Sequence, residues 1–276
     1  MCAPSALDGS HVLETLQYVV KDGVGTLTLN RPQRKNAIDA VMREELRQVI
    51  ANMPGQRDLR ALIITGAGAT FCAGGDISVM GAGTLSPEEG RHRMRHDYLS
   101  WIETLLRLEI PVISAVEGPA YGAGFSLALT ADIVLAAPSS RFCLSFMKLG
   151  LIPDCAAFYT LPRVVGLQRA KELAFSAREL SAREAKDLGI VLEVLPEGRV
   201  LERAQQMANC FAQAAPAALA MTKRALNASL NSSLEIMMDI EADGQAVART
   251  SQWHTDAVQR FLNKQPSAFK WPNALD

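Results

Sequence analysis

The sequence predicts an α/β fold followed by a helical C-terminal region. Short β-branched apolar segments alternate with amphipathic segments as far as about residue 200. From Val200 onward the apolar residues recur only at helical spacing. Because no linker, low-complexity stretch or fixed-period repeat interrupts the chain, we expect an α/β core over residues 1–200 and a helical region over residues 201–276 within one domain.

The composition is that of a globular protein with a sizeable core. Of 276 residues, 49% are hydrophobic and 21% are charged. The formal net charge of −1 provides no overall field toward nucleic acid or an anionic membrane, so neither partner is expected. No stretch approaches the ~18 apolar residues of a membrane span, and the first twenty residues lack the basic start and apolar run of a signal peptide. These features favour a soluble cytoplasmic protein.

The five cysteines indicate reduced thiols. Their number is odd and no CxxC spacing occurs, a pattern that fits a reducing compartment better than a disulfide framework. Cys72 and Cys155 are expected to be small core residues.

The first elements are a hairpin, a helix and a buried strand. "LQYVV" and "VGTLTLN" are joined by "KDG", the pattern of a β-hairpin. After the loop "RPQRK", apolar residues at i, i+4, i+7 and i+8 predict a helix that buries Met42, Leu46, Val49 and Ile50. "ALIITG" (61–66) is a β-branched run ended by glycine, which predicts a buried strand before the small-residue loop "AGATFCAGGDI".

Capping signals and apolar runs predict the remaining elements. Ser86-Pro87-Glu88-Glu89 is a capping box that starts a helix with one face formed by Tyr98, Ile102 and Leu105. "PVISAV" (111–116) and "DIVLAA" (132–137) are predicted strands, and "EGPAYGAGFSLAL" between them should be a glycine-rich turn feeding a helix. A second capping box, Ser181 to Glu184, starts a helix that Gly189 ends. The last helical segments should bury Leu201, Ala204, Ala208 and Phe211.

Two glycine-rich loops are candidates for an oxyanion site. "CAGGD" (72–76) and "YGAGF" (121–125) each follow a predicted buried strand. Where side chains are small, a ligand can approach the backbone N–H groups closely enough for them to hold an oxyanion. The alternative is a pair of tight turns that need glycine for packing. Neither loop completes GxGxxG and no GK[ST] occurs, which excludes the dinucleotide and P-loop motifs.

Three other patterns carry a chemical and a structural interpretation. Arg31, Arg34 and Lys35 could pair with phosphates or form a solvated turn. Ser126 lies in a partial nucleophile elbow whose last glycine is absent. His92 and His96 at i, i+4 could ligate a metal, but the neighbouring arginines would repel a cation, so a solvated helix face is expected. No metal or redox cofactor is predicted.

Asp154 is a single acid within the apolar segment "LGLIPDCAAF" (149–158). The nearest acids along the chain are Asp132 and Glu172. Ionised aspartate is seldom buried without a partner, and desolvation would raise its pKa. Asp154 is therefore either a catalytic base or a helix N-cap that follows Pro153.

Four motifs together resemble one family. "LNRPQRKNAI", "AGATFCAGGDI", "AVEGPAYGAGFSLALTADIVLA" and "FMKLGLIPDCAAFYTLPRVVG" are similar in order and spacing to the enoyl-CoA hydratase/isomerase (crotonase) superfamily, from about residue 15 to about residue 268. The resemblance implies a spiral of ββα units and C-terminal helices that form a homo-trimer or a dimer of trimers. It also implies an acyl-CoA thioester as the substrate, with coenzyme A as part of that substrate and not a separate cofactor.

The resemblance assigns roles to individual positions. The oxyanion donors would be the backbone N–H groups of Gly75 and Ala123. Arg34 and Lys35 would lie near the adenosine and phosphates. Five further residues would contact the CoA moiety: Ala37, Ala73, Gly74, Asp76 and Ile77. Phe261 and Lys264 would reach the CoA of a neighbouring subunit.

The departures from the family pattern favour isomerase chemistry. The two catalytic glutamates of the hydratases would fall on Ser126 and Phe146, neither of which is acidic. Adding water usually needs one group to activate the water and another to handle the proton, so ordinary hydratase activity is disfavoured. "GLIPD" resembles the pattern of 1,2-epoxyphenylacetyl-CoA isomerases and related enoyl-CoA isomerases, whose catalytic aspartate falls on Asp154. This resemblance implies an isomerase of fatty acid or aromatic acid catabolism that shifts a double bond, or rearranges an epoxide, through one aspartate.

Other activities remain open from the sequence. Asp154 could act as a nucleophile in a dehalogenase or hydrolase, or the chain could be a hydratase with an atypical site. A dienoyl-CoA isomerase fits less well, because its second acid would fall on Phe146. A non-catalytic acyl-CoA binder or assembly subunit is the last alternative, since "CAAFYT" replaces the Gly-Gly pair that isomerases usually carry after the aspartate.

Overall fold

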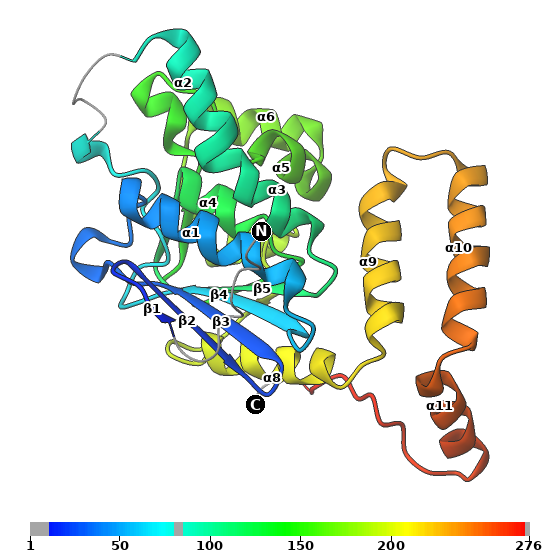
Figure 1. Cartoon of the computed structure of the whole chain (residues 1–276). Coiled ribbons are helices and arrows are strands. Elements are labelled where there is room, and N and C mark those ends of the chain that lie inside the picture. The colour runs from blue at the N-terminus through cyan, green and yellow to red at the C-terminus, as the bar shows by residue number, and fades with distance from the viewer. Residues whose placement is uncertain (1–10, 80–84, 274–276) are drawn as a thin grey trace, which may run out of the picture.

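The computed structural model describes residues 11–79 and 85–273. Cys2 and the first half of the segment tested for a signal peptide lie outside these residues. A mixed sheet forms the centre of the fold (Figure 1), with strand order β1-β2-β3-β4-β5-β7-β10. Its strands are β1 (His11–Val12), β2 (Leu16–Lys21), β3 (Val24–Leu29), β4 (Ala61–Gly66), β5 (Val112–Val116), β7 (Ile133–Ala136) and β10 (Glu193–Val194). β1 to β3 pair antiparallel, and from β3 onward the pairing is parallel.

A smaller sheet lies beside the first one and was not predicted. It consists of β6 (Pro119–Tyr121), β8 (Arg141–Cys143) and β9 (Leu180–Ser181) in the order β6-β8-β9. These strands have two or three residues each, too few to show an alternating pattern in the sequence. β6 lies inside the segment that we expected to be a simple glycine-rich turn.

The helices agree with the capping and periodicity signals with two exceptions. They are α1 (Ala40–Asn52), α2 (Pro87–Arg93), α3 (Leu99–Arg107), α4 (Ala123–Ala128), α5 (Ala157–Val165), α6 (Leu167–Ser176), α7 (Ala182–Asp187), α8 (Val200–Ala212), α9 (Pro216–Ser229), α10 (Leu234–Arg249) and α11 (Gln252–Leu262). The helix predicted from Ser86 is divided by a π-helical turn at Met94–Tyr98. Leu201 is exposed, because α8 turns Val200 and Met207 toward the core instead.

The two faces of the sheet are covered by different helices. Leu62 and Ile64 point into the larger core, to which α1 and α3 contribute. Ala61 and Ile63, one residue out of phase, pack with α8. This alternation is the period-2 geometry of a strand that is buried on both faces. The one polar side chain of "ALIITG", Thr65, donates its hydroxyl to the carbonyl of Ala115 at 3.0 Å.

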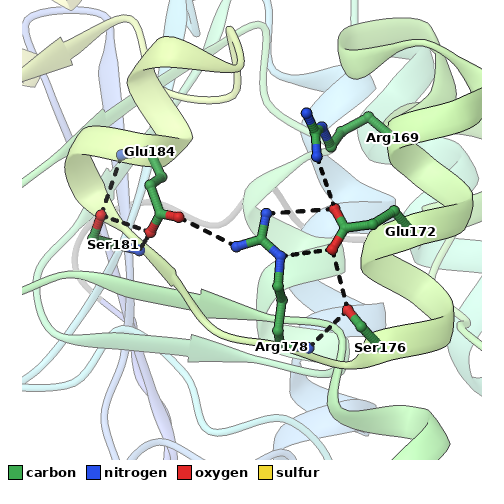
Figure 2. A network of polar contacts seen from close by, with 6 residues as sticks. All are labelled: Arg169, Glu172, Ser176, Arg178, Ser181 and Glu184. Carbon is green, nitrogen blue, oxygen red and sulfur yellow. Dashed lines mark hydrogen bonds and ion pairs between the residues drawn. The ribbon is translucent and has the colours of Figure 1, made fainter.

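Polar networks fix the short connections after α6. Arg178 bridges Glu172 of α6 and Glu184 of α7 (Figure 2), with Nε and Oε1 of the first pair 2.6 Å apart. Ser181 and Glu184 form the predicted capping box at the start of α7. These bonds lower the pKa of Glu184, chiefly through the backbone and side chain of Ser181.

The C-terminal helices extend from the core as an arm, defined as α9 to α11 (Figure 1). None of these helices contains a buried residue. Lys223 of α9 joins the arm to the core through an ion pair with Asp132, Nζ to Oδ2 2.7 Å.

The segment after α11 returns to α8. Arg203, 1% exposed, forms an ion pair with Glu193 and donates to the backbone carbonyls of Pro272 and Asn273. Cys210 donates to the carbonyl of Lys270. Both ends of the arm are therefore attached to the same helix. Among the described residues, no helix is long and apolar enough to cross a bilayer.

Candidate active site

The loop of residues 72–76 is held by residue 38 on one side. Ile38 donates its N–H to the carbonyl of Gly74 at 2.8 Å and accepts from the N–H of Asp76 at 3.0 Å. This is a parallel bridge between Ile38 and Gly75. In such a bridge the bonds to one residue come from the two neighbours of its partner, and the partner's own N–H faces the other way. The amide of Gly75 therefore faces away from Ile38.

The opposite side of the loop faces β6 and the start of α4. Cys72 forms a bridge with Ala120. Gly74 has φ +95°, and a Cβ atom on it would stand 2.7 Å from the carbonyl oxygen of Tyr121 and 3.4 Å from the nitrogen of Ala123. Glycine is required here both by the backbone conformation and by the close approach. The two predicted oxyanion loops are thus neighbours.

The structure leaves the two predicted donor amides available. Over residues 11–79 and 85–273, neither Gly75 N–H nor Ala123 N–H has a protein acceptor outside regular structure. Ala123 is the first residue of α4, where an amide has no acceptor within its own helix. Two such amides on adjacent loops can stabilise a developing oxyanion.

Asp154 is a mostly buried carboxyl group. In the described part of the chain its Oδ1 has no hydrogen-bond partner. Burial raises the pKa of Asp154, while a hydrogen bond from Cys155 acts in the opposite direction. α5 has Ala156 as its N-cap residue and no side-chain cap. The N-cap interpretation of Asp154 is therefore wrong.

Two thiols connect Asp154 to the glycine loop. Cys155 and Cys72 are both fully buried, as predicted. Burial raises the pKa of Cys155 well above its usual value, and the charges of Asp154 and Cys72 act in the same direction. Cys72 in turn accepts the N–H of Gly74 at 3.4 Å. The sequence identified both cysteines as core residues but gave no sign that Asp154 and Cys72 both raise the pKa of Cys155.

The backbone conformation after Asp154 turns the chain sharply. Cys155 and Ala156 have φ of +49° and +65°, a conformation that costs a residue with a side chain about 1–3 kcal/mol. The resemblance to isomerases places their usual Gly-Gly pair on Ala156 and Ala157. Ala156 lines a cavity of about 200 Å³ together with Arg95, Leu99, Ile102, Glu103 and Leu106. Four of these lining residues are apolar, and two, Arg95 and Glu103, are charged.

The predicted CoA-binding residues divide into exposed and buried groups. Arg34 and Lys35 are exposed and form no ion pair within the described residues. Ile77 is 67% exposed, whereas Ala37 is buried. Ala73 lies against Lys35, to whose carbonyl it donates at 3.0 Å.

Asp76 is engaged inside the protein. It is 8% exposed, accepts from Arg31 Nη1 at 3.2 Å and accepts from Ser78 Oγ at 2.6 Å. The bonds from Ser78, with the charge and hydrogen bond of Arg31, lower the pKa of Asp76. Arg31 also pairs with Asp39. Arg31 is therefore not a phosphate ligand, contrary to the interpretation of "RPQRK" as one cluster.

The remaining predicted residues lie elsewhere. Phe261 is 81% exposed on α11, which lies apart from α4 and α5 (Figure 1), and it lines a cavity of about 740 Å³ between α11 and the start of α9. Lys264, just after α11, is also exposed. A single chain does not bring either residue to Asp154.

Four residues considered in the sequence analysis form no catalytic or metal site within the described chain: Ser126, Phe146, His92 and His96. Ser126 is fully buried and donates to the carbonyl of Gly122 at 3.3 Å, so the nucleophile elbow is not formed. Phe146 is buried. His92 and His96 are exposed, as expected, with ring centroids 4.2 Å apart. In the described part of the chain no three metal-binding side chains gather.

Comparison with known proteins agrees with this architecture. Residues 20–272 match the family described as enoyl-CoA hydratase/isomerase. The chain is 37% identical to 1,2-epoxyphenylacetyl-CoA isomerase of Escherichia coli strain K12, over 94% of this chain and 99% of that protein. It is 32% identical to short-chain-enoyl-CoA hydratase of Clostridium acetobutylicum, over 89% of this chain and 94% of that protein.

A solved structure shows the same fold. The crystal structure of enoyl-CoA hydratase/isomerase from Cupriavidus metallidurans CH34 superposes with a TM-score of 0.88 at 42% identity, covering 96% of this chain and 100% of that one. The predicted family and its α/β fold with a C-terminal helical region are confirmed. The chain belongs to the enoyl-CoA hydratase/isomerase family of the crotonase superfamily.

Proposed function

We propose that this protein is an acyl-CoA isomerase that moves a double bond by proton transfer through Asp154. The observation that carries the proposal is the buried Oδ1 of Asp154, which has no hydrogen-bond partner among residues 11–79 and 85–273. A carboxylate that is neither ion-paired nor a helix cap is costly to bury, so its presence fits a working base. Asp154 and Cys72 both raise the pKa of Cys155, and Cys72 accepts the N–H of Gly74 in the loop that carries the Gly75 amide.

The chemistry needs one base and an oxyanion site. Asp154 removes a proton from the carbon α to the thioester, and the electron pair of the C–H bond moves onto the thioester oxygen. The N–H groups of Gly75 and Ala123 stabilise that negative charge, each donor being worth about 3 kcal/mol of the barrier. The protonated Asp154 then returns the proton to the γ carbon. Burial raises the pKa of Asp154, which makes its ionised form a stronger base.

The absence of a second acid separates this proposal from hydration. Ser126 and Phe146 occupy the positions where the resemblance places the hydratase glutamates, and both are buried. Relatives bear isomerase and hydratase names alike, so the distinction rests on these side chains. Neither Ser126 nor Phe146 can activate water, so the two positions that hydratases use for this step supply no acid here.

The proposal includes CoA phosphates at Arg34 and Lys35, whose exposed charges have no carboxylate partner in the described chain. No cofactor beyond the CoA of the substrate is proposed. The acyl group would extend over the apolar surface of α3 beside Ala156.

We also infer a homo-trimer or a dimer of trimers assembled through the arm. Large apolar side chains are exposed along α9 to α11: Leu226, Leu230, Leu234, Ile236, Met238, Val247 and Phe261. An apolar surface of this extent is expected to be covered by protein. Light scattering of the wild type and of a Leu234→Lys variant tests this point, and a monomeric wild type would contradict it.

The activity is tested with Asp154→Asn. Conversion of 3-hexenoyl-CoA to the conjugated 2-enoyl thioester, followed by absorbance, should fall by at least about a thousandfold, since the base is removed. Binding of saturated hexanoyl-CoA should be retained. Asp187→Asn, an exposed carboxylate on α7 that pairs with Arg183, serves as the control and should remain active.

Three outcomes decide against the proposal. Unchanged turnover in Asp154→Asn would show that Asp154 is not the catalytic base. Hydration of 2-enoyl-CoA by the wild type, with no migration, would favour a hydratase, and a covalent adduct on Asp154 would favour a nucleophile.

A further inference from the structure

We propose that the ion pair between Arg31 and Asp76 transmits binding of the CoA phosphates to the Gly75 amide, so that the nucleotide part of CoA raises kcat and does not only tighten binding. The inference rests on the proposed oxyanion role of Gly75. It adds a positioning function for two side chains that lie outside the reacting centre.

Arg31 links two segments through one buried guanidinium group. Its side chain is 13% exposed and forms ion pairs with Asp39 at 2.9 Å and Asp76 at 3.2 Å. Nη1 also donates to the carbonyl of Ala37 at 2.5 Å. The planar fork therefore contacts the segment of residues 37–39 and the glycine loop at the same time, a geometry that a lysine cannot reproduce.

Asp76 is adjacent to the oxyanion donor. Its backbone N–H is bound by Ile38 and its carboxylate by Arg31, while Ile38 also binds the carbonyl of Gly74. The residues on both sides of Gly75 are thus fixed to the segment of residues 31–39. Gly75 itself has no such bond, so its amide moves with its neighbours. A displacement of this segment displaces the amide.

The same segment carries the exposed cations. Lys35 accepts the N–H of Ala73 at 3.0 Å, and Lys35 and Asn36 have φ of +52° and +53°. Asn36 is fully buried and donates to the carbonyls of Ala67 and Thr70 at 2.9 Å and 2.6 Å. Arg34 and Lys35 therefore stand on a rigid turn whose other side is the glycine loop. Phosphates that bind Arg34 and Lys35 would therefore act directly on the position of this turn.

Energy from this remote contact can be used at the reacting centre. Binding energy raises kcat only where it improves interactions of the transition state, and a displacement of about 1 Å at a donor can cost about a hundredfold in rate. The Arg31 contacts supply a short and stiff connection, from the phosphate side of the turn to the residue next to the donor.

The test compares two thioesters that differ only in the nucleotide. 3-Hexenoyl-CoA and 3-hexenoyl-pantetheine carry the same reacting group, but only the first has phosphates for Arg34 and Lys35. For the wild type, kcat is expected to be at least about tenfold higher with the CoA ester. In Asp76→Asn and in Arg31→Lys, the ratio of kcat with the CoA ester to kcat with the pantetheine ester should fall toward about 1.

A control variant and KM separate positioning from general damage. Glu44→Gln removes an exposed ion pair of α1 with Arg47 and should leave the ratio of the two kcat values unchanged. KM for the CoA ester should stay within about twofold in Arg31→Lys, because the proposed phosphate ligands, Arg34 and Lys35, are intact. A variant in which kcat falls equally for both thioesters would overturn the inference, as would a wild type with equal kcat values.

A second readout does not depend on turnover. The stretching frequency of an isotope-labelled thioester carbonyl in saturated hexanoyl-CoA reports how strongly the oxyanion donors polarise it. It should shift to lower frequency in the wild-type complex and shift less in Asp76→Asn or with hexanoyl-pantetheine. If this dependence is present without double-bond migration, the inference stands and the proposed isomerase activity fails. If migration occurs and the carbonyl shift is the same in all complexes, the inference fails alone.

Discussion

The carbonyl oxygen of Cys72 lies 2.3 Å from the position that a Cβ atom on Gly124 would occupy. No real Cβ atom tolerates a contact of this length, so the first turn of α4 can pack on the glycine loop only with glycine at this position. The contact holds Ala123, the residue before Gly124, beside the loop that carries Gly75.

Gly124→Ala is expected to destabilise the protein by about 2–4 kcal/mol, since a backbone atom of Cys72 must move to admit the methyl group. Urea unfolding at neutral pH measures the change. The control is Gly90→Ala: Gly90 lies in α2, where an added Cβ meets no atom within 4 Å. That variant should gain up to about 1 kcal/mol, and equal losses in both would contradict the steric argument.

Asp154→Asn is expected to be more stable than the wild type at pH 7. Burial raises the pKa of Asp154 above its ordinary value of 3.8, so the folded chain binds the proton more tightly than the unfolded chain. The wild type therefore loses stability as pH rises through the folded pKa, and the neutral amide avoids this loss. The advantage should vanish below pH 3.8, where the carboxyl is protonated in both states. Urea midpoints at several pH values measure it, and a variant less stable at neutral pH would show that Asp154 has a partner.

The acid limb of the pH–rate profile is expected above the usual aspartate range, because catalysis needs ionised Asp154 and burial raises the pKa of Asp154. The Cys155 hydrogen bond lowers that pKa, so Cys155→Ala should displace the limb further toward high pH. Cys210→Ala, whose thiol contacts Lys270 in the C-terminal segment, should leave the profile in place. If the acid limb of the pH–rate profile stays in place in Cys155→Ala, the thiol does not lower the pKa of Asp154.

Lys223→Met is expected to loosen α9 from the core. The ammonium group donates to Asp132 Oδ2 at 2.7 Å and to the carbonyl of Ile110 at 2.8 Å, and hydrogen bonds to charged groups contribute about 1.5–3 kcal/mol each. Hydrogen exchange of the α9 amides should accelerate. Arg224, also on α9, forms an exposed ion pair with Glu109. Arg224→Ala should change the hydrogen-exchange rates of the α9 amides little. If both variants accelerate exchange equally, the partly buried pair is not what attaches the helix.

Local signals in the sequence predicted the regular elements well. The buried face of α1 consists of the four residues that its periodicity selects, β4 has the predicted bounds, and both capping boxes are formed. These features depend on neighbours within one turn or one strand. The prediction that Leu201 is buried was wrong. Packing against Ile63 and Leu135 decides which side of α8 faces the sheet, and the local sequence does not show this.

The sequence predicted which residues belong to the candidate site, but not which of them contact one another. Asp154 and the two glycine loops were identified from their neighbours in sequence. The contact of Arg31 with Asp76 spans 45 residues, and the association of Cys72 with Cys155 joins two separate loops. Nothing in either local pattern distinguishes a buried arginine from a surface one. The pairing of Arg31 with Asp76 follows from the topology, because these residues come after β3 and β4, two neighbouring parallel strands.

The clamp of Arg203 on Pro272 and Asn273 makes the arm a span supported at both ends. A single proteolytic cut between α10 and α11 would consequently release no fragment, because each piece remains anchored on α8. Rearranging the apolar surface of the arm would require its two anchor points to give way together, which confers mechanical resilience on the region that would meet its neighbours.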